Sequence, residues 1–196
     1  MDIRKKPSSD KKLVARHAIG TFGAPPNVWR FACEGENFCL DIGGCADRPV
    51  VGVVSYTTIG LSDYEVMTGP EPPAHVELAA ACAADRPLFA NILAAAAMLL
   101  VRQRKEIKPG DATRDVIAEF YPRATVSHLY FARPFLWGQR LDLLRGESRN
   151  IAWLLAVPVT GDELLELQTQ GDTGLEQLYL QRRVEMYSLD RATWLA

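Results

Sequence analysis

The side chains best suited to catalysis lie between residues 62 and 77. Ser62 and Asp63 are adjacent, and His75 and Glu77 stand two residues apart in a segment that is otherwise apolar. A hydroxyl, an imidazole and two carboxyls would equip a small hydrolase if they converged within hydrogen-bond reach. Nothing in their spacing holds them together, and acids solvated on loops are the simpler interpretation.

His75 and Glu77 also match the His-x-Glu element of zinc deaminases, in which the histidine binds zinc and the glutamate transfers protons. That element begins a helix and needs Pro-Cys-x-x-Cys downstream. Here the segment has the pattern of a strand, and only Cys82 follows it. We therefore reject the deaminase hypothesis. Whether His75, Glu77 and Cys82 are more than structural stays open at this point.

Other catalytic and ligand-binding motifs are missing from the sequence. It contains no Gly-x-Gly-x-x-Gly, no Gly-x₄-Gly-Lys-Ser/Thr and no Gly-x-Ser-x-Gly. The three histidines are far apart, and the four cysteines include no Cys-x-x-Cys pair. We therefore predict that the protein is not an enzyme, with no catalytic residues, no metal site and no cofactor.

Apolar periodicity and capping residues predict the elements that would position these side chains. The expected strands are residues 28–33, 38–42, 50–58, 75–82, 126–131 and 151–157. The expected helices are residues 11–19, residues 88–105, and two that begin after the capping residues Thr160 and Thr173. Asp10 and Gly20 are expected to begin and end the first helix. The β-branched residues on both faces of 50–58 indicate a central strand that is covered on both sides.

The order of these elements is a helix, several strands, a long helix, further strands and then helices, which is not regular βαβ alternation. We therefore predict an α/β (α+β) single domain with a mixed central sheet of about 5–7 strands and helices packed on it. Residues 1–24 are expected to form an N-terminal helix of this same domain, and residues 25–196 to form the rest of it.

The bulk composition is that of an ordinary globular protein. The chain has 196 residues, of which 48% are hydrophobic and 23% charged, and its net charge of −2 does not indicate a nucleic-acid partner. The N-terminus lacks the pattern of a secretory signal. The longest apolar run, residues 88–101, is shorter than the roughly 20 residues that cross a bilayer. We therefore predict no membrane role and a cytoplasmic location.

Charge is nevertheless unevenly distributed along the chain. Residues 1–16 carry six basic groups against two acids, and residues 161–196 carry seven acids against three arginines. Each end is explained by a solvated helix face, or alternatively by a patch that steers a partner.

The segment at residues 55–64 is the best candidate for recognition. It leaves a buried strand, turns at Gly60 and presents hydroxyl and aromatic side chains, which suits a rigid recognition edge. The alternative to a role in recognition is that Ser62 and Asp63 cap the local backbone. Phe135 and Trp137 are candidate aromatic anchors for a partner, and core packing under a loop explains them equally well.

Four stretches in order resemble the Suppressor of fused domain family. They are Gly-Leu-Ser-Asp at residues 60–63, His-Val-Glu-Leu at 75–78, Arg-Pro-Leu at 86–88 with Lys-Pro-Gly-Asp at 108–111, and the hydrophobic run into acidic residues at 151–164. The lead-in at residues 47–52 is similar to that of bacterial members. The resemblance covers residues 25–190, and this chain is too short for the second lobe of the animal protein.

The resemblance implies the role of small bacterial relatives, which is that of an immunity or antitoxin-type protein of a polymorphic toxin system. On this hypothesis the chain neutralises a toxin by binding it, with a partner docking on residues 55–64 and on neighbouring strand edges. The alternatives are a signalling scaffold or chaperone-like domain that binds a regulatory protein, and the small hydrolase. The predicted partner-binding residues are Tyr56, Thr58, Gly60, Leu61, Ser62, Asp63, Tyr64, Glu77 and Trp137. The oligomeric state stays open.

Overall fold

A computed structural model describes residues 8–23, 26–33, 38–70, 73–103, 106–141, 143–170 and 174–192. Its strands are β1 (Asn27–Cys33), β2 (Phe38–Ala46), β3 (Val53–Ile59), β4 (Met67–Thr68), β5 (Ala74–Ala83), β6 (Ala112–Thr113), β7 (His128–Ala132), β8 (Leu144–Arg145) and β9 (Asn150–Val159). Its helices are α1 (Ser9–Phe22), α2 (Phe89–Gln103), α3 (Gly161–Gln170) and α4 (Gly174–Arg182), with short 3-10 turns η1 (Leu61–Asp63) and η2 (Gly138–Leu141).

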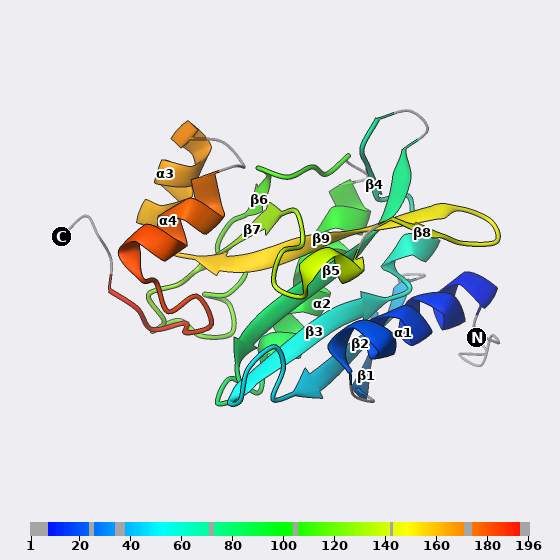
Figure 1. The fold of residues 1–196 in the computed structure, drawn as a ribbon, viewed down its shortest axis with the longest axis horizontal. Helices are drawn as coiled ribbons and strands as arrows, with labels where there is room; N and C mark the ends of the chain where they lie inside the picture. Colours follow the sequence, from blue (N-terminus) through cyan, green and yellow to red (C-terminus); the bar gives the residue numbers. More distant parts are fainter. Residues whose placement is uncertain are drawn as a thin grey trace.

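All nine described strands belong to one mixed sheet, in the order β1-β2-β3-β5-β9-β7-β6 (Figure 1). The two-residue strands β4 and β8 pair with β5 and β9 outside this order. β5 and β9 run parallel at the centre, and the other pairs are antiparallel. The predicted mixed sheet with packed helices is therefore confirmed. Its three two-residue strands raise the number of described strands to nine, above the predicted 5–7.

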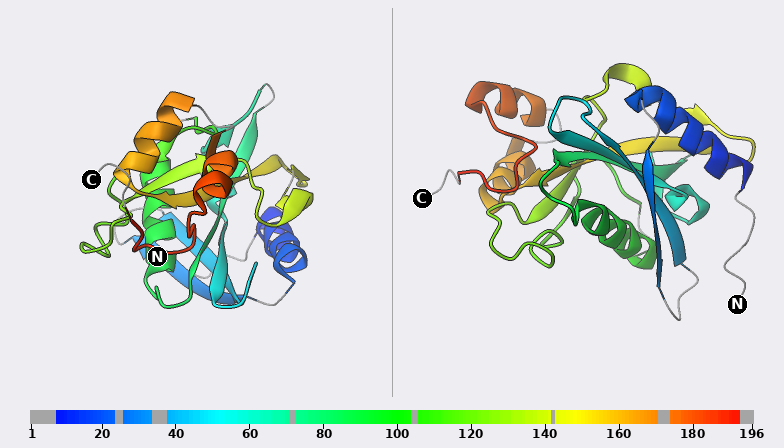
Figure 2. Two further views of the ribbon diagram at one scale, coloured as in Figure 1. Left: turned by 60° about the vertical axis from the view of Figure 1, so that its left-hand side comes forward. Right: turned by 90° about the horizontal axis from the view of Figure 1, so that it is seen from below.

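Helices cover both faces of this sheet. Figure 2 shows α1 and α2 on opposite sides of it. One core joins α2 to the sheet, and a second core joins α1, η2, α3 and α4 to the other face. The sequence of β5 alternates between them, because Ala80 and Cys82 lie in the first core and Ala79 and Ala81 in the second. Small residues let both layers approach this central strand closely, which explains a strand rich in alanine.

The strand β3 begins three residues later than its β-branched pattern predicts. Val50 and Val51 lie in the preceding turn, and Val51 is 88% exposed. The turn is held by Asp47, whose carboxylate accepts a hydrogen bond from the Gly52 N–H at 2.9 Å, and Gly52 has a φ of 80°. Turn chemistry therefore overrides the apolar pattern at these two valines.

Both predicted ends of α1 were wrong. The N-cap is Ser8, whose hydroxyl accepts from the Lys11 N–H at 3.1 Å, while Asp10 is buried and bonds elsewhere. The helix continues past Gly20 and ends at Gly23, a left-handed C-cap whose N–H donates to the Ile19 carbonyl. Serine and aspartate are equally good caps, and distant partners of Asp10 decide between them.

The start of α3 is as predicted. The Glu163 N–H donates to the Thr160 hydroxyl at 3.2 Å, and the Thr160 N–H donates to the Glu163 carboxylate at 3.0 Å, which is a capping box. The corresponding expectation for Thr173 and the hairpin turn at residues 34–37 lie outside the described residues. None of the described helices is long and apolar enough to cross a membrane.

Candidate functional site

The predicted recognition segment is built around the buried carboxyl group of Glu77 on β5. Glu77 is completely inaccessible to solvent, and its oxygens accept hydrogen bonds from the N–H groups of Gly60 at 2.9 Å, Leu61 at 3.3 Å and Ser62 at 3.1 Å. The hydroxyls of Ser62, at 2.7 Å, and of Thr58 also donate to it. One side chain therefore holds the whole turn that follows β3.

Burial raises the pKa of Glu77, and the hydrogen bonds from the Thr58 and Ser62 hydroxyls and from the turn N–H groups oppose that shift only in part. A perturbed carboxyl group is a common sign of a catalytic site. Here both oxygens are occupied by donors from the protein itself. The group is therefore used to shape the turn and is closed to a substrate.

The Gly-Leu-Ser-Asp sequence fits the geometry of this turn. Gly60 has a φ of 105°, a left-handed conformation that strains other residues, and a Cβ there would lie 3.1–3.2 Å from the Lys11 side chain. Leu61 is fully buried in the core beside α2. Glycine is thus required by the backbone, leucine by the core, and Ser62 by the hydrogen bonds to Glu77.

Lys11 ties α1 to the sheet next to this turn. Its Nζ lies 2.9 Å from a carboxylate oxygen of Asp41 on β2, whose other oxygen lies 2.8 Å from Nε of Arg30 on β1. Burial raises the pKa of Asp41, but the hydrogen bonds from Arg30 and Lys11 outweigh that effect and lower it. The three charges join the first three elements of the chain, α1, β1 and β2.

Asp10 makes a second connection between α1 and the turn. Its buried carboxylate accepts hydrogen bonds from the Glu147 N–H at 2.8 Å and from the Ser148 hydroxyl, and Arg149 Nε lies 3.6 Å away. Burial alone would raise the pKa of Asp10, and these contacts lower it. Arg149 in turn donates to the Ser62 carbonyl. The loop between β8 and β9 thereby clamps α1 onto the Glu77 turn.

Seven of the nine predicted partner-binding residues are buried: Tyr56, Thr58, Gly60, Leu61, Ser62, Glu77 and Trp137. Asp63 is exposed and Tyr64 half-buried. The Tyr64 hydroxyl accepts from the Cys39 N–H at 2.7 Å, and burial raises its pKa. The segment is thus a rigid structural element whose reachable side chains are Asp63 and Tyr64.

Trp137 packs inside the second core, which is the alternative that its sequence context left open. Its indole N–H donates to the Ser55 hydroxyl at 2.9 Å, and its ring centroid lies 5.0 Å from that of Phe22. The indole N–H of Trp153 likewise donates to Thr57, at 3.1 Å. These two tryptophans explain the hydroxyls of Ser55 and Thr57 in β3, and Glu77 explains that of Thr58. Phe135 is partly buried beside them.

The predicted hydrolase residues do not form a working set. Ser62 and Glu77 bond to each other inside the protein, whereas His75 Nδ1 lies 3.0 Å from the Tyr64 carbonyl, and Asp63 accepts from the Ser8 hydroxyl at 3.4 Å. No histidine in the described part of the chain is bonded to Ser62.

A second group of residues resembles a Ser-His-Asp triad and was missed from the sequence, because no motif marks its spacing. Ser127 Oγ lies 3.2 Å from His128 Nε2, and an Asp115 carboxylate oxygen lies 3.5 Å from Nδ1. The Asp115 N–H, however, donates to Nδ1 at 2.9 Å. Nδ1 is therefore the acceptor and Nε2 carries the proton, so His128 donates to Ser127. A catalytic base needs the opposite tautomer.

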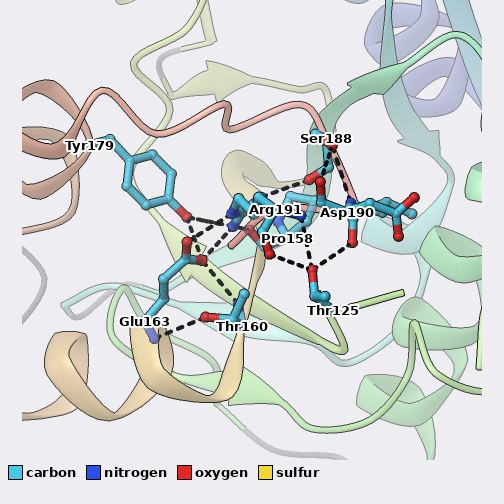
Figure 3. A network of polar contacts seen from close by, with 9 residues as sticks. Thr125, Pro158, Thr160, Glu163, Tyr179, Ser188, Asp190 and Arg191 are labelled. Carbon is cyan, nitrogen blue, oxygen red and sulfur yellow. Dashed lines mark hydrogen bonds and ion pairs between the residues drawn. The ribbon is translucent and has the colours of Figure 1, made fainter. Parts of the chain in front are cut away.

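A separate buried network holds the C-terminal segment against the other end of the sheet (Figure 3). Arg191 bonds to both oxygens of Glu163, with Nε at 2.7 Å, and also donates to the Pro158 carbonyl at 2.6 Å and to the Tyr179 hydroxyl at 3.1 Å. Glu166 pairs with Arg182 at 3.0 Å. Two of the seven acids of residues 161–196 are thus paired with arginines of the same stretch.

Two further observations concern possible ligand sites. In the described residues, no group of three His, Cys, Asp or Glu side chains is placed to hold a metal ion. A cleft of about 320 Å³ lies between the end of α2 and β6, with Leu99, Ile107, Asp111 and Phe131 among its lining residues.

The family model described as "Suppressor of fused protein (SUFU)" matches residues 37–192, which include the Glu77 turn, the clamp at Arg149 and the buried Arg191 network. The chain belongs to the SUFU family. Among curated proteins it is 29% identical over 187 residues to "Immunity protein YqcF" of Bacillus subtilis (strain 168), and the match covers 94% of this chain and 96% of that protein.

Solved structures of SUFU proteins have the same fold. A putative SUFU homologue from Neisseria gonorrhoeae FA 1090 superposes with a TM-score of 0.71 at 14% identity, over 95% of this chain and 98% of that one. A chain of the Sufu–Fu complex gives 0.69 at 16% identity, over 96% and 93%. Drosophila Suppressor of Fused gives 0.70 at 17% identity, and this chain spans 53% of its length.

Proposed function

We propose that this SUFU protein is a cytoplasmic immunity protein that neutralises a toxin by binding it. The observation that carries the proposal is the full-length similarity to Immunity protein YqcF, which leaves little of either chain unmatched. An immunity-type role is thereby supported for the whole domain. A toxin as the bound partner, and occlusion of its active site as the mechanism, are the steps that we add.

The geometry supports binding over catalysis. The carboxyl group of Glu77 is saturated by donors of its own turn, and His128 has the tautomer that cannot activate Ser127. The fold is instead held rigid by two hydrophobic cores and by three polar networks, which are centred on Asp41, Asp10 and Arg191. A rigid surface loses little entropy on binding, which favours a tight complex.

Affinity capture from the native cytoplasm tests the proposal. The tagged chain should capture a protein that stops growth when it is expressed alone, and co-expression of the chain should restore growth. Gly60→Arg, which would distort the Glu77 turn, should weaken the rescue, whereas Val51→Lys in the exposed β2–β3 turn should not. Capture of no growth-inhibiting protein at high input would overturn the immunity role.

A further inference from the structure

The strand β1 forms one outer edge of the sheet. Within the described residues, its one strand partner is β2, with which it pairs along its full length from Asn27 to Cys33. Figure 1 shows it at the end of the sheet remote from α3 and α4. The side chains of Asn27, Val28, Trp29 and Arg30 are exposed, and Val28 is 56% exposed.

The main chain of such an edge can pair with another strand through both its N–H and its C=O groups. In an antiparallel pair, alternate residues direct their N–H and C=O groups to the partner, so the remaining residues of β1 direct theirs away from β2. Its seven residues extend over about 23 Å at about 3.3 Å per residue. Proteins usually blunt an edge of this length with charged side chains, a proline, a bulge or a very short strand, and Arg30 is the one charged residue of β1. The described β1 has neither proline nor a break in its register with β2.

The side chains of β1 restrict what can add to it. Trp29 lies over Gly44, where a Cβ would come within 2.6 Å of the indole ring, and its centroid is 6.3 Å from that of Tyr56. Trp29 as a whole residue is nevertheless 41% exposed. Next to it, the side chain of Arg30 is 56% exposed although one side of its guanidinium bonds to Asp41. The edge therefore offers an aromatic surface and one positive charge.

We propose that β1 is where the toxin docks, by adding an extended strand of its own to this edge. This inference rests on the proposed function. The added strand carries an acidic residue opposite Arg30 and apolar residues opposite Val28 and against Trp29. Main-chain hydrogen bonds then supply affinity, and the charge and the indole select the partner, as in other cases of strand addition.

A second copy of the chain is a poorer occupant of the same edge. Antiparallel pairing of two β1 strands about a two-fold axis, with all seven residues matched, places Arg30 directly opposite Arg30 of the other copy. Like charges directly opposite each other destabilise a strand pair. An acidic residue of a different protein avoids this repulsion.

Amide hydrogen exchange and binding assays with the captured toxin test the inference. Exchange of the β1 amides that face away from β2 should slow at least tenfold in the complex. The N–H groups of Val28 and Trp29 point to opposite sides of the strand, one toward β2 and one away from it. Of the two variants Val28→Pro and Trp29→Pro, one therefore removes an outward donor and keeps the pairing with β2. That variant should raise Kd about 30-fold, equivalent to about 2 kcal/mol. Arg30→Gln should raise it about tenfold, and the control Arg123→Gln should leave it unchanged.

The outcomes separate the two proposals. If wild-type protein binds the toxin but the amides that become protected lie elsewhere, such as at the cleft between α2 and β6, strand addition at β1 is overturned and the immunity role stands. If β1 becomes protected by self-association without toxin, the proposed occupant is wrong. If no toxin binds, both proposals fail. Circular dichroism of each variant shows that loss of binding is not loss of folding.

Discussion

Ser62 donates two hydrogen bonds to one carboxyl oxygen of Glu77, from its N–H at 3.1 Å and from its hydroxyl at 2.7 Å. A serine beside a buried glutamate resembles catalytic machinery, and the sequence alone allows that interpretation. The geometry shows instead that donors of the turn occupy both carboxyl oxygens of Glu77. Ser62 and Glu77 therefore stabilise the turn that follows β3.

Replacing Glu77 should destabilise the domain. In Glu77→Gln the amide nitrogen must face at least one N–H donor of Gly60, Leu61 or Ser62, so we expect a loss of about 2–4 kcal/mol in the free energy of unfolding. Glu65→Gln, at an exposed position, should change it by about 0.5 kcal/mol at most. Urea denaturation measures both. Equal stability of the two variants would remove Glu77 as the anchor of the turn.

The contribution of Asp10 should depend on pH. Its pKa is lowered in the folded state, so its carboxylate stabilises the fold above the ordinary value near 3.8, and this stabilisation is lost as the pH falls through the lowered pKa. The penalty for Asp10→Asn should accordingly be largest at neutral pH and fade in acid. Denaturant titrations from pH 7 to pH 2.5 would show it. Ser148→Ala, which removes one donor, should reduce the pH dependence; a penalty that is the same at every pH would contradict the assignment.

The Glu163–Arg191 pair should show strong coupling in a double-mutant cycle. Either Glu163→Gln or Arg191→Met leaves a buried polar group without its partner, and each should cost about 3 kcal/mol. The double variant should cost clearly less than the sum of the two. The more exposed pair of Glu166 and Arg182 is the comparison, with an expected coupling below about 1 kcal/mol. Additive effects at Glu163 and Arg191 would show that the network in Figure 3 does not hold the C-terminal segment.

Two glycines should respond to alanine in opposite directions. Gly60→Ala forces a φ of 105° on a residue with a Cβ and crowds Lys11, so we expect a loss of about 1–3 kcal/mol. Gly20→Ala, in an open position on α1, should stabilise the domain by about 0.5–1 kcal/mol because alanine favours a helix. Thermal unfolding of the two variants tests both signs, and stabilisation by Gly60→Ala would disprove the left-handed turn.

The sequence predicts local structure well where the interactions are local. The capping box of Thr160 and Glu163 spans three residues, and the apolar run of α2 lies within one element, so both were recognisable. The position of β5 was also predicted, although its alanines are poor strand formers. They suit it because helices cover both faces, which is a property of the folded sheet.

The sequence does not reveal the partners that tertiary structure supplies. Asp10 suits an N-cap in sequence, but its carboxylate accepts a hydrogen bond from Ser148, which lies 138 residues away. Glu77 and Ser62 meet because β3 and β5 pair, and Trp137 has the composition of a partner anchor but is drawn into the core by Ser55 and Phe22. Seven of the nine predicted contact residues are therefore buried, since polar and aromatic side chains look alike in sequence whether they face solvent or a core.

Titration of the captured toxin with this protein tests most directly whether neutralisation occurs by binding. Toxin activity should fall linearly with added protein and reach its minimum at a fixed molar ratio, independent of incubation time. Progressive inactivation of the toxin by a substoichiometric amount of the protein would show catalysis and contradict the account.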